Sequence, residues 1–275
     1  GDIPGDITGT KECKILHELI FLGCQVDYFF DYQGLDVNHR DSGGCTLLHA
    51  ACQHRHGPDV AVDAKKEENE QVSIFRRLID IGADIKAQDN HGRNVLHCMA
   101  MLQTFSEYEK SLEYVLEKGP SLADQPDCEG KTPLYYAMEL GGKEGDLGIG
   151  KKMLKAGADP FVISNDGNNL LNVLATYLED KEARISFKKL VDRGVDVNHR
   201  NNQGEAPIFA FYKRRWIHYY PWQLDGTDGA GCSIDGEPVE LKYKKKRQSA
   251  NSMLKKIGID FFARDAKGRG LLHVV

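Results

Sequence analysis

The sequence predicts an all-α solenoid, in which antiparallel helix pairs stack along the chain and β-turn fingers join them. The main observation is a sequence motif that recurs as GGCTLLHAAC at 43–52, HGRNVLHCMA at 91–100 and KGRGLLHVV at 267–275. Recurrence in phase is typical of repeat proteins, in which each repeat is one supersecondary unit. The second observation is length, since 275 residues reach the roughly 250–300 at which a single core stops growing.

The recurring phrase keeps its phase over seven units. Aligned on its histidine, the units are centred on His17, His49, His97, Tyr135, Asn172, Phe209 and His273. A glycine lies five residues before the last six centres, at Gly44, Gly92, Gly130, Gly167, Gly204 and Gly268. An Asp, Ser or Asn lies eight residues before them, at Asp41, Asp89, Asp127, Ser164, Asn201 and Asp265. The first unit has Glu12 at the glycine position, which marks it as an atypical end unit.

The second half of each unit repeats as well. An apolar helical run is followed by glycine, aspartate and an extended segment, as in 75–89, 154–166, 190–201 and 254–265. We expect the glycine to cap the helix in the left-handed conformation, which only glycine adopts at low cost. The Asp or Asn then turns the chain, and the next Thr, Ser or Asn begins a new helix.

These phrases resemble the ankyrin repeat, a turn followed by two antiparallel helices with a period near 33. The segment DNHGRNVLHCMA (89–100) is similar to the family's D-x-x-G-x-T-P-L-H-x-A-A phrase, and DCEGKTPLYYAM (127–138) keeps its Thr-Pro-Leu. The resemblance covers nearly all of residues 10–275. It implies that the recurrent histidine is a structural hydrogen-bonding residue between repeats, with no metal-binding or catalytic role.

The resemblance also implies a binding surface along the turn tips and the first helices. At the family's variable contact positions lie Asn90, His91, Arg93, Met101, Leu102, Glu129, Lys131, Glu139, Leu140, Tyr177, Lys213 and Arg214. The pattern places Met101, Leu102, Leu140 and Tyr177 near solvent, where apolar groups often contact a partner. The alternative is that these side chains are buried locally or cover the insertions.

Two spacings exceed one repeat and predict insertions at 53–71 and 212–248, between the two helices of their units. The first is acidic and has no aromatic residue, which is typical of a solvated loop. The second holds both tryptophans of the chain, has basic runs at both ends, and includes EPVELKY, which alternates like a short strand.

We consider three roles for the second insertion. Its aromatic side chains can pack it onto the solenoid, bind a peptide or acidic protein, or stack on nucleic acid bases. An aromatic cage for a methylated lysine is a further form of peptide recognition. The candidate contacts are Arg214, Arg215, Trp216, Tyr219, Tyr220 and Trp222.

Composition limits the function classes. A net charge of −5 argues against general attraction to nucleic acid, and no apolar run reaches the roughly 18 residues needed to span a bilayer. Seven cysteines, odd in number and without C-x-x-C spacing, fit free thiols in a reducing compartment. We find no G-x-S-x-G, Walker A or H-E-x-x-H motif and no metal-spaced Cys/His cluster, so we predict no enzyme activity, metal or cofactor.

The sequence therefore predicts one ankyrin-repeat solenoid over 1–275, with about seven units of which the first and last are atypical. We expect a non-enzymatic scaffold that binds another protein or peptide inside the cell. The location is cytoplasm or nucleus, since KKKR (244–247) resembles a basic import signal. The alternatives are a reader of modified peptides or nucleic acid through 212–248, and the targeting segment of a larger enzyme.

We further expect a monomer, unless the apolar C-terminal end self-associates. The last unit supplies a turn and the start of a first helix, and then the sequence stops at Val275. Solenoids need a polar terminal unit to cover the last apolar face. The expectation is that the parent protein continues or that a neighbouring molecule covers this end.

Overall fold

The computed structural model describes residues 35–52, 75–102, 105–213 and 239–273. Within these ranges the chain forms helices and turns, and its only β-type pairing is one isolated bridge between Ile163 and Asn169. The predicted all-α, ankyrin-type solenoid of helix pairs and fingers is confirmed. The described residues fall into two compact units, which we treat separately.

Unit 1 holds the described residues up to Ala137, together with Gly148–Asp159. Its helices are α3 (Leu47–Cys52), a helix over 75–80, α5 (Val95–Leu102), α6 (Phe105–Lys118), the 3₁₀ helix η1 (Pro120–Asp124) and α8 (Gly148–Lys155). Helix α7 (Pro133–Glu144) begins in this unit and ends in the other. Packing joins α3 to α5, α5 to α6, and α6 to α8.

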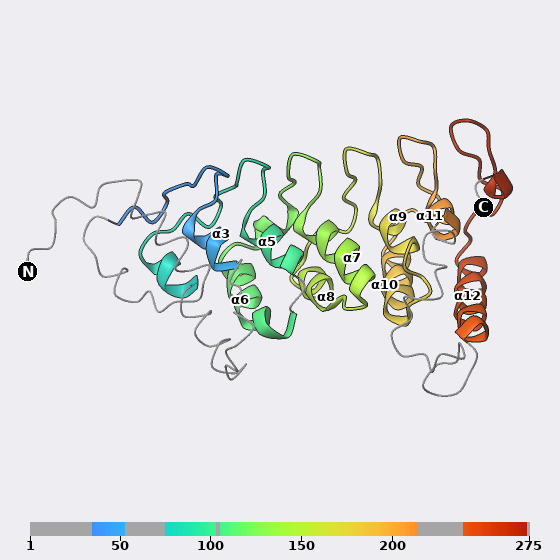
Figure 1. Ribbon diagram of the computed structural model, residues 1–275, viewed down its shortest axis with the longest axis horizontal. Helices are drawn as coiled ribbons and strands as arrows, with labels where there is room; N and C mark the ends of the chain where they lie inside the picture. Colours follow the sequence, from blue (N-terminus) through green and yellow to red (C-terminus); the bar gives the residue numbers. More distant parts are fainter. Residues whose placement is uncertain (1–34, 53–74, 103–104, 214–238, 274–275) are drawn as a thin grey trace, which may run out of the picture. The chain divides into compact units, whose positions relative to one another are not determined.

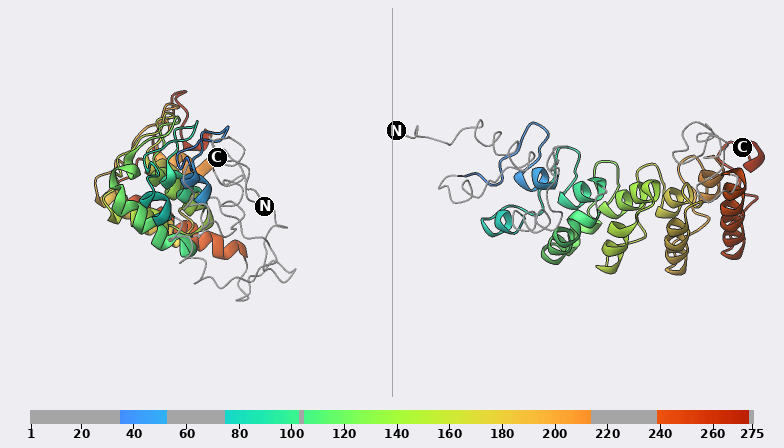
Figure 2. Two further views of the ribbon diagram at one scale, coloured as in Figure 1. Left: turned by 90° about the vertical axis from the view of Figure 1, so that its left-hand side faces the viewer. Right: turned by 60° about the horizontal axis from the view of Figure 1, so that its bottom comes forward.

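Unit 2 holds Met138–Leu147 and the described residues from Pro160 onward. It contains α9 (Leu170–Ala175), α10 (Lys181–Asp192), α11 (Pro207–Lys213), α12 (Val239–Lys256) and the 3₁₀ helix η4 (Leu271–His273). Helix α9 packs against α10 and α11. The long helices α10 and α12 extend away from the fingers in roughly the same direction (Figures 1 and 2). That the whole chain forms one continuous solenoid stays a prediction.

One local expectation is wrong. The alternation in EPVELKY suggests a short strand, but α12 begins at Val239 and continues to Lys256. Eighteen residues without Gly or Pro, rich in Lys, favour a helix, and five alternating residues are too few to outweigh that preference. Residues 239–248, which the sequence analysis assigns to the insertion, thus belong to a helix.

The fingers that precede the first helices share one internal hydrogen-bond pattern. The carboxylate of Asp89 accepts hydrogen bonds from the backbone N–H groups of His91 (2.8 Å) and Arg93 (2.9 Å). The side chains at the same position in four other fingers accept the same pair of bonds. They are Asp41, Asp127, Asn201 and Asp265. The sequence prediction that this residue turns the chain is thereby confirmed.

Successive fingers are joined by backbone hydrogen bonds. In unit 1 the N–H of Asn90 donates to the carbonyl of Gly43 and that of Cys128 to His91, each over 2.9 Å. In unit 2 the N–H of Asn202 donates to Asp166 over 3.0 Å, and that of Ala266 to Gln203 over 2.9 Å. Each unit therefore presents its finger tips as a row on a fixed backbone.

The core lies where the first helices meet their neighbours. The two residues before each recurrent centre are buried in five of the repeats, at Leu47 and Leu48, Val95 and Leu96, Pro133 and Leu134, Leu170 and Leu171, and Pro207 and Ile208. Phe187 on α10 and Phe209 on α11 are fully buried in unit 2. These apolar positions are the ones that the repeat pattern indicates.

Two cysteines are part of this core, and their reactivity provides a test of the packing. Cys52 and Cys98 are buried, and burial raises the pKa of Cys98 to about 12 and that of Cys52 well above its ordinary value. We expect both thiols to resist iodoacetamide at pH 8, because the thiolate is the reactive form. Peptide mapping by mass spectrometry should show labelling of both only after denaturation, with the exposed Cys128 labelled in the native protein. Rapid native labelling of Cys98 would contradict the packing of α5.

Candidate partner-binding surface

The recurrent histidines connect each repeat to the next finger. The Nε2–H of His49 donates to the carbonyl of Arg93 (3.0 Å), and that of His97 to the carbonyl of Lys131 (3.1 Å). On the other side of each ring, Nδ1 accepts from a backbone N–H at the start of the same helix, that of Thr46 or Asn94. Burial lowers the pKa of both histidines, so both rings are neutral near pH 7.

An asparagine performs the same task in unit 2. Asn172 accepts a hydrogen bond from the N–H of Asn169 through Oδ1 (3.0 Å) and donates through Nδ2 to the carbonyl of Glu205 (3.2 Å). The amide thus reproduces both hydrogen bonds of the imidazole. Because an amide can replace the imidazole in this way, the recurrent histidine serves as a structural connector between repeats. This agrees with the role that the sequence indicates for it.

The predicted contact residues of unit 1 form what we call the finger surface: Asn90, His91, Arg93, Met101, Glu129 and Lys131. Asn90 and His91 are exposed at the finger tip. The Nδ2 of Asn90 also donates to the carbonyl of Ser42 in the preceding finger (3.1 Å). Asn90 therefore holds two fingers together as well as facing solvent.

Arg93 is held in place by an ion pair inside its finger. Its Nε and Nη2 lie 2.7 and 2.6 Å from Oδ2 of the buried Asp89. Burial acts to raise the pKa of Asp89, but the hydrogen bonds from Arg93 outweigh it and the pKa is lowered. The other end of the guanidinium, Nη1, lies 3.8 Å from Sδ of Met101. A fixed cation and an exposed thioether thus lie side by side.

Lys131 occupies in the next finger the position that Arg93 has in its own. Its Nζ lies 2.8 Å from a carboxylate oxygen of Glu129 and 5.4 Å from the ring centre of Tyr136. The hydroxyl of Tyr136 donates to Oδ2 of Asp127 (2.7 Å), and Asp127 is the equivalent of Asp89. A tyrosine thus contacts the carboxylate here, whereas Arg93 contacts it in the preceding finger. Equivalent positions therefore keep one architecture while their exposed chemistry differs.

The predicted contact residues of unit 2 are more enclosed than the sequence suggests. Glu139, Leu140 and Tyr177 are half-buried. The ring of Tyr177 covers Gly142 so closely that a Cβ there would lie 2.7 Å from it. The exposed Lys213 lies 2.5 Å from Oε2 of Glu205. Whether these residues contact a partner stays a prediction.

Part of the predicted set lies outside the described residues. These are the side chain of Leu102 and the insertion residues Arg214, Arg215, Trp216, Tyr219, Tyr220 and Trp222. Tyr136 is the residue that sequence reasoning missed, and the role of Asp89 in holding the cation of Arg93 was not predicted either. The Asp-x-x-x-Arg pattern at 89–93 is a signal for this, because it recurs at 265–269 with the same ion pair (2.7 Å).

Two kinds of feature are absent from the described part of the chain, a cluster that could hold a metal ion and a helix that could span a membrane. Those residues contain no group of three or more His, Cys, Asp or Glu side chains that could hold a metal ion. Among the helices of the same residues, none is long and apolar enough to cross a bilayer. Each of the two units presents fingers with exposed side chains of varied chemistry.

Known proteins share this repeat. A family model described as ankyrin repeats (3 copies) matches residues 60–145. Neurogenic locus notch homolog protein 1 of Danio rerio is 25% identical over 181 residues, which cover 66% of this chain and 6% of that protein. Putative ankyrin repeat protein R841 of Acanthamoeba polyphaga mimivirus is 26% identical over 181 residues, covering 66% of this chain and 28% of the relative.

A further relative is ankyrin repeat protein OPG189 of Variola virus, 25% identical over 205 residues, which cover 64% of this chain and 33% of that protein. The chain thus spans at most a third of the length of these relatives. Three observations agree on the ankyrin repeat. The motif keeps its glycine and aspartate in phase, backbone hydrogen bonds join successive fingers, and the matched relatives include named ankyrin repeat proteins. The chain therefore carries ankyrin repeats, which the family model matches over residues 60–145.

Proposed function

We propose that the chain is a non-enzymatic scaffold that binds another protein along the finger surface. The observation that carries the proposal is that equivalent finger positions expose different side chains on one fixed backbone. His91 and Arg93 in one finger correspond to Glu129 and Lys131 in the next. Such variation on a constant frame favours a recognition surface, since the folding of the finger does not depend on these side chains being exposed.

The rigidity of the surface supports binding. The backbone bond from Asn90 to Gly43 and the side-chain bond from Asn90 to Ser42 fix the spacing of two fingers. A surface that is ordered before it meets its partner loses less conformational entropy on association. The ion pair with Asp89 does the same for the long side chain of Arg93.

The chemistry of the surface favours a partner segment with both acidic and apolar residues. Arg93 offers a guanidinium with one edge already paired to Asp89, and Met101 beside it is 37% exposed. Methionine adapts its shape to apolar partners, and arginine is enriched in binding hot spots. The residues Glu139, Leu140, Tyr177 and Lys213 provide a second proposed set of contacts, in unit 2.

The test replaces Met101 by Asp and compares it with Ile185→Asp. Ile185, on α10, is 36% exposed against 37% for Met101, so the control introduces the same charge at a similarly exposed position. In pull-downs from nuclease-treated lysate, we expect wild type and Ile185→Asp to retain partners that Met101→Asp loses. With a purified partner, the loss should be about fivefold or more, as for a residue contributing over about 1 kcal/mol.

Charge reversal at Arg93 is a poor test of this surface, because it would place a second carboxylate against the buried Asp89 and destabilise the finger. Glu129→Lys, at an exposed position, is the suitable charge variant. Equal retention of every partner by wild type, Met101→Asp and Glu129→Lys would exclude the finger surface. Interaction through 212–248, and an attached enzyme, remain predictions from sequence.

A further inference from the structure

An asparagine side chain before the finger joins one repeat to the next. Asn38 donates from Nδ2 to the carbonyl of Gly82 in the following repeat (3.1 Å). Its Oδ1 accepts from the N–H of Asp84 (2.7 Å). In unit 2, Asn198 forms the same two bonds with the segment 258–260, over 3.2 and 2.8 Å. The side-chain amide thus occupies a carbonyl and an N–H group that the Gly-x-Asp sequence of the following repeat presents.

The junction between the repeat of Phe161 and the one after it lacks this connection. Gly194 and Asp196 form the same Gly-x-Asp sequence, but the residue at the asparagine position before them is Phe161. Within the described residues, neither the carbonyl of Gly194 nor the N–H of Asp196 has a hydrogen-bond partner. At another junction, Asp124 occupies the asparagine position and still accepts from the N–H of Asp159 (2.7 Å). Of the Gly-x-Asp junctions that the structure describes on both sides, that of Phe161 alone lacks both bonds.

The position two residues further on departs from the other repeats in the same direction. Arg40 and Arg200 each donate from Nη1 to a backbone carbonyl of the following repeat. The equivalent residue after Phe161 is Ile163, whose side chain cannot donate. Phe161 and Ile163 are 54% and 51% exposed, so neither adds much to the core. Exposed apolar groups that replace a stabilising contact are typical of functional sites.

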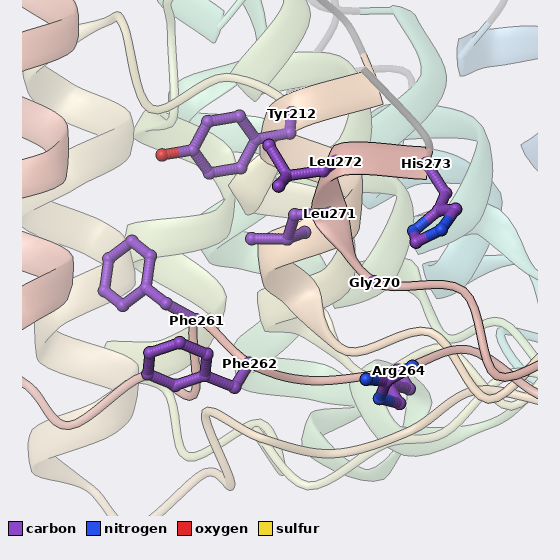
Figure 3. Close-up of a pocket in the computed structure, with 8 residues that line it drawn as sticks. All are labelled: Tyr212, Phe261, Phe262, Arg264, Gly270, Leu271, Leu272 and His273. Carbon is purple, nitrogen blue, oxygen red and sulfur yellow. The ribbon is translucent and has the colours of Figure 1, made fainter.

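Phe262 has the position of Phe161 in the last repeat, where Figure 3 shows it near Phe261. The sequence contains no repeat after this one, so the exposure of Phe262 cannot be compared with that of an internal position. Phe161, in contrast, lies at a junction whose two sides are both described, and its exposure is a property of the internal repeats.

We propose that Phe161, Ile163, Gly194 and Asp196 form a binding site, the Phe161 site, for a partner segment in which a side-chain amide lies beside apolar residues. The chain's own junctions show the chemistry, because the amide of an asparagine supplies both the donor and the acceptor that the Gly-x-Asp backbone requires. A carboxylate, as in Asp124, can accept from the N–H but cannot donate to the carbonyl. Apolar neighbours of the amide would cover Phe161 and Ile163 and remove them from water.

The Phe161 site is accessible and independent of the finger surface. Gly194 and Asp196 are both exposed, so a partner can reach their backbone groups without any unfolding of the chain. The residues of the site belong to unit 2, whereas the finger surface lies in unit 1. Failure of either proposal therefore leaves the other standing.

The probe is the peptide acetyl-Leu-Ser-Asn-Ser-Leu-amide, added to the full chain and followed by proton–nitrogen correlation NMR. In an extended peptide the amide and both leucines lie on one face, and the palindromic order makes the test independent of chain direction. We expect a saturable shift of the Asp196 N–H with a Kd of about 1 mM, as suits two exposed hydrogen bonds and a small apolar contact. The N–H of Asp260, which Asn198 already binds, is the internal control and should not shift.

Control peptides and protein variants separate the two parts of the site. Replacing the asparagine of the peptide by aspartate, or both leucines by serine, should weaken binding about fivefold or more. Phe161→Asn should place an amide of the chain itself on Gly194 and Asp196, as Asn198 does at its own junction. This variant should therefore lose peptide binding and unfold at a higher urea concentration than wild type. Phe161→Ala should weaken binding without raising the urea midpoint.

Several results would overturn the proposal. They are equal binding of the asparagine and aspartate peptides, a shift at Asp260 as large as that at Asp196, and binding to Phe161→Asn that matches wild type. Absence of a saturable shift at about 10 mM peptide would also overturn it. Loss of peptide binding in Phe161→Asn, together with its higher urea midpoint, supports the proposal.

Discussion

Gly204→Ala is expected to lower the free energy of unfolding by roughly 2–5 kcal/mol, the sum of a strained backbone and a broken contact between fingers. Gly204 has a φ of +73°, where a residue with a Cβ is strained. A Cβ at this position would also lie 2.6 Å from the backbone nitrogen of Ala266 and 3.1 Å from its Cα. These are backbone atoms, so relief requires the two fingers to move apart.

Separation of these fingers breaks the hydrogen bond from the N–H of Ala266 to the carbonyl of Gln203 (2.9 Å). Gly194→Ala is the matched control in the same unit. Gly194 has a φ of +96° and no atom within 4 Å of the added Cβ. It should therefore show the backbone strain alone, about 1–2 kcal/mol.

Urea unfolding followed by circular dichroism measures both variants. A midpoint for Gly204→Ala well below that of Gly194→Ala would attribute the difference to contact between fingers. Similar midpoints for the two variants would show that finger stacking contributes little, and that the recurrent glycine is needed only for its backbone conformation.

The sequence is sufficient to predict the fingers because their chemistry is local. Gly92 and Asp89 act within five residues, and the same spacing recurs in six repeats, so phase alone identifies them. The buried Leu47 and Leu48 are predictable for the same reason, since a helix that packs on one side must place its apolar residues there.

The candidate surface is less predictable because it depends on distances between side chains of different fingers. Asn90 looks like a free contact position in sequence, but its amide reaches the carbonyl of Ser42. Tyr177 looks exposed, but its ring is pressed against Gly142 of α7. Both outcomes follow from how closely repeats approach one another, which the residue types alone do not determine.

His97→Ala is expected to lower the free energy of unfolding by roughly 2–4 kcal/mol, whereas His97→Asn should retain most of the stability. Alanine leaves the buried N–H of Asn94 and the carbonyl of Lys131 without their partner, and each such loss costs about 1–3 kcal/mol. Asparagine restores both bonds if it adopts the geometry of Asn172. The match is close, because the helix of Asn172 also begins with an asparagine, Asn169. Equal destabilisation by the two variants would contradict this equivalence.

The same histidines make stability depend on pH. Burial lowers the pKa of His49 and His97 below the ordinary value of 6.5, so the unfolded chain binds protons that the folded chain does not. Stability from these groups is therefore complete above pH 6.5 and is lost as the pH falls through that value toward the folded pKa. His97→Asn removes one of the two groups while retaining its hydrogen bonds. Urea midpoints measured from pH 7.5 to pH 5 should accordingly fall less steeply in His97→Asn than in wild type, and parallel curves would show that His97 is not titrated on unfolding.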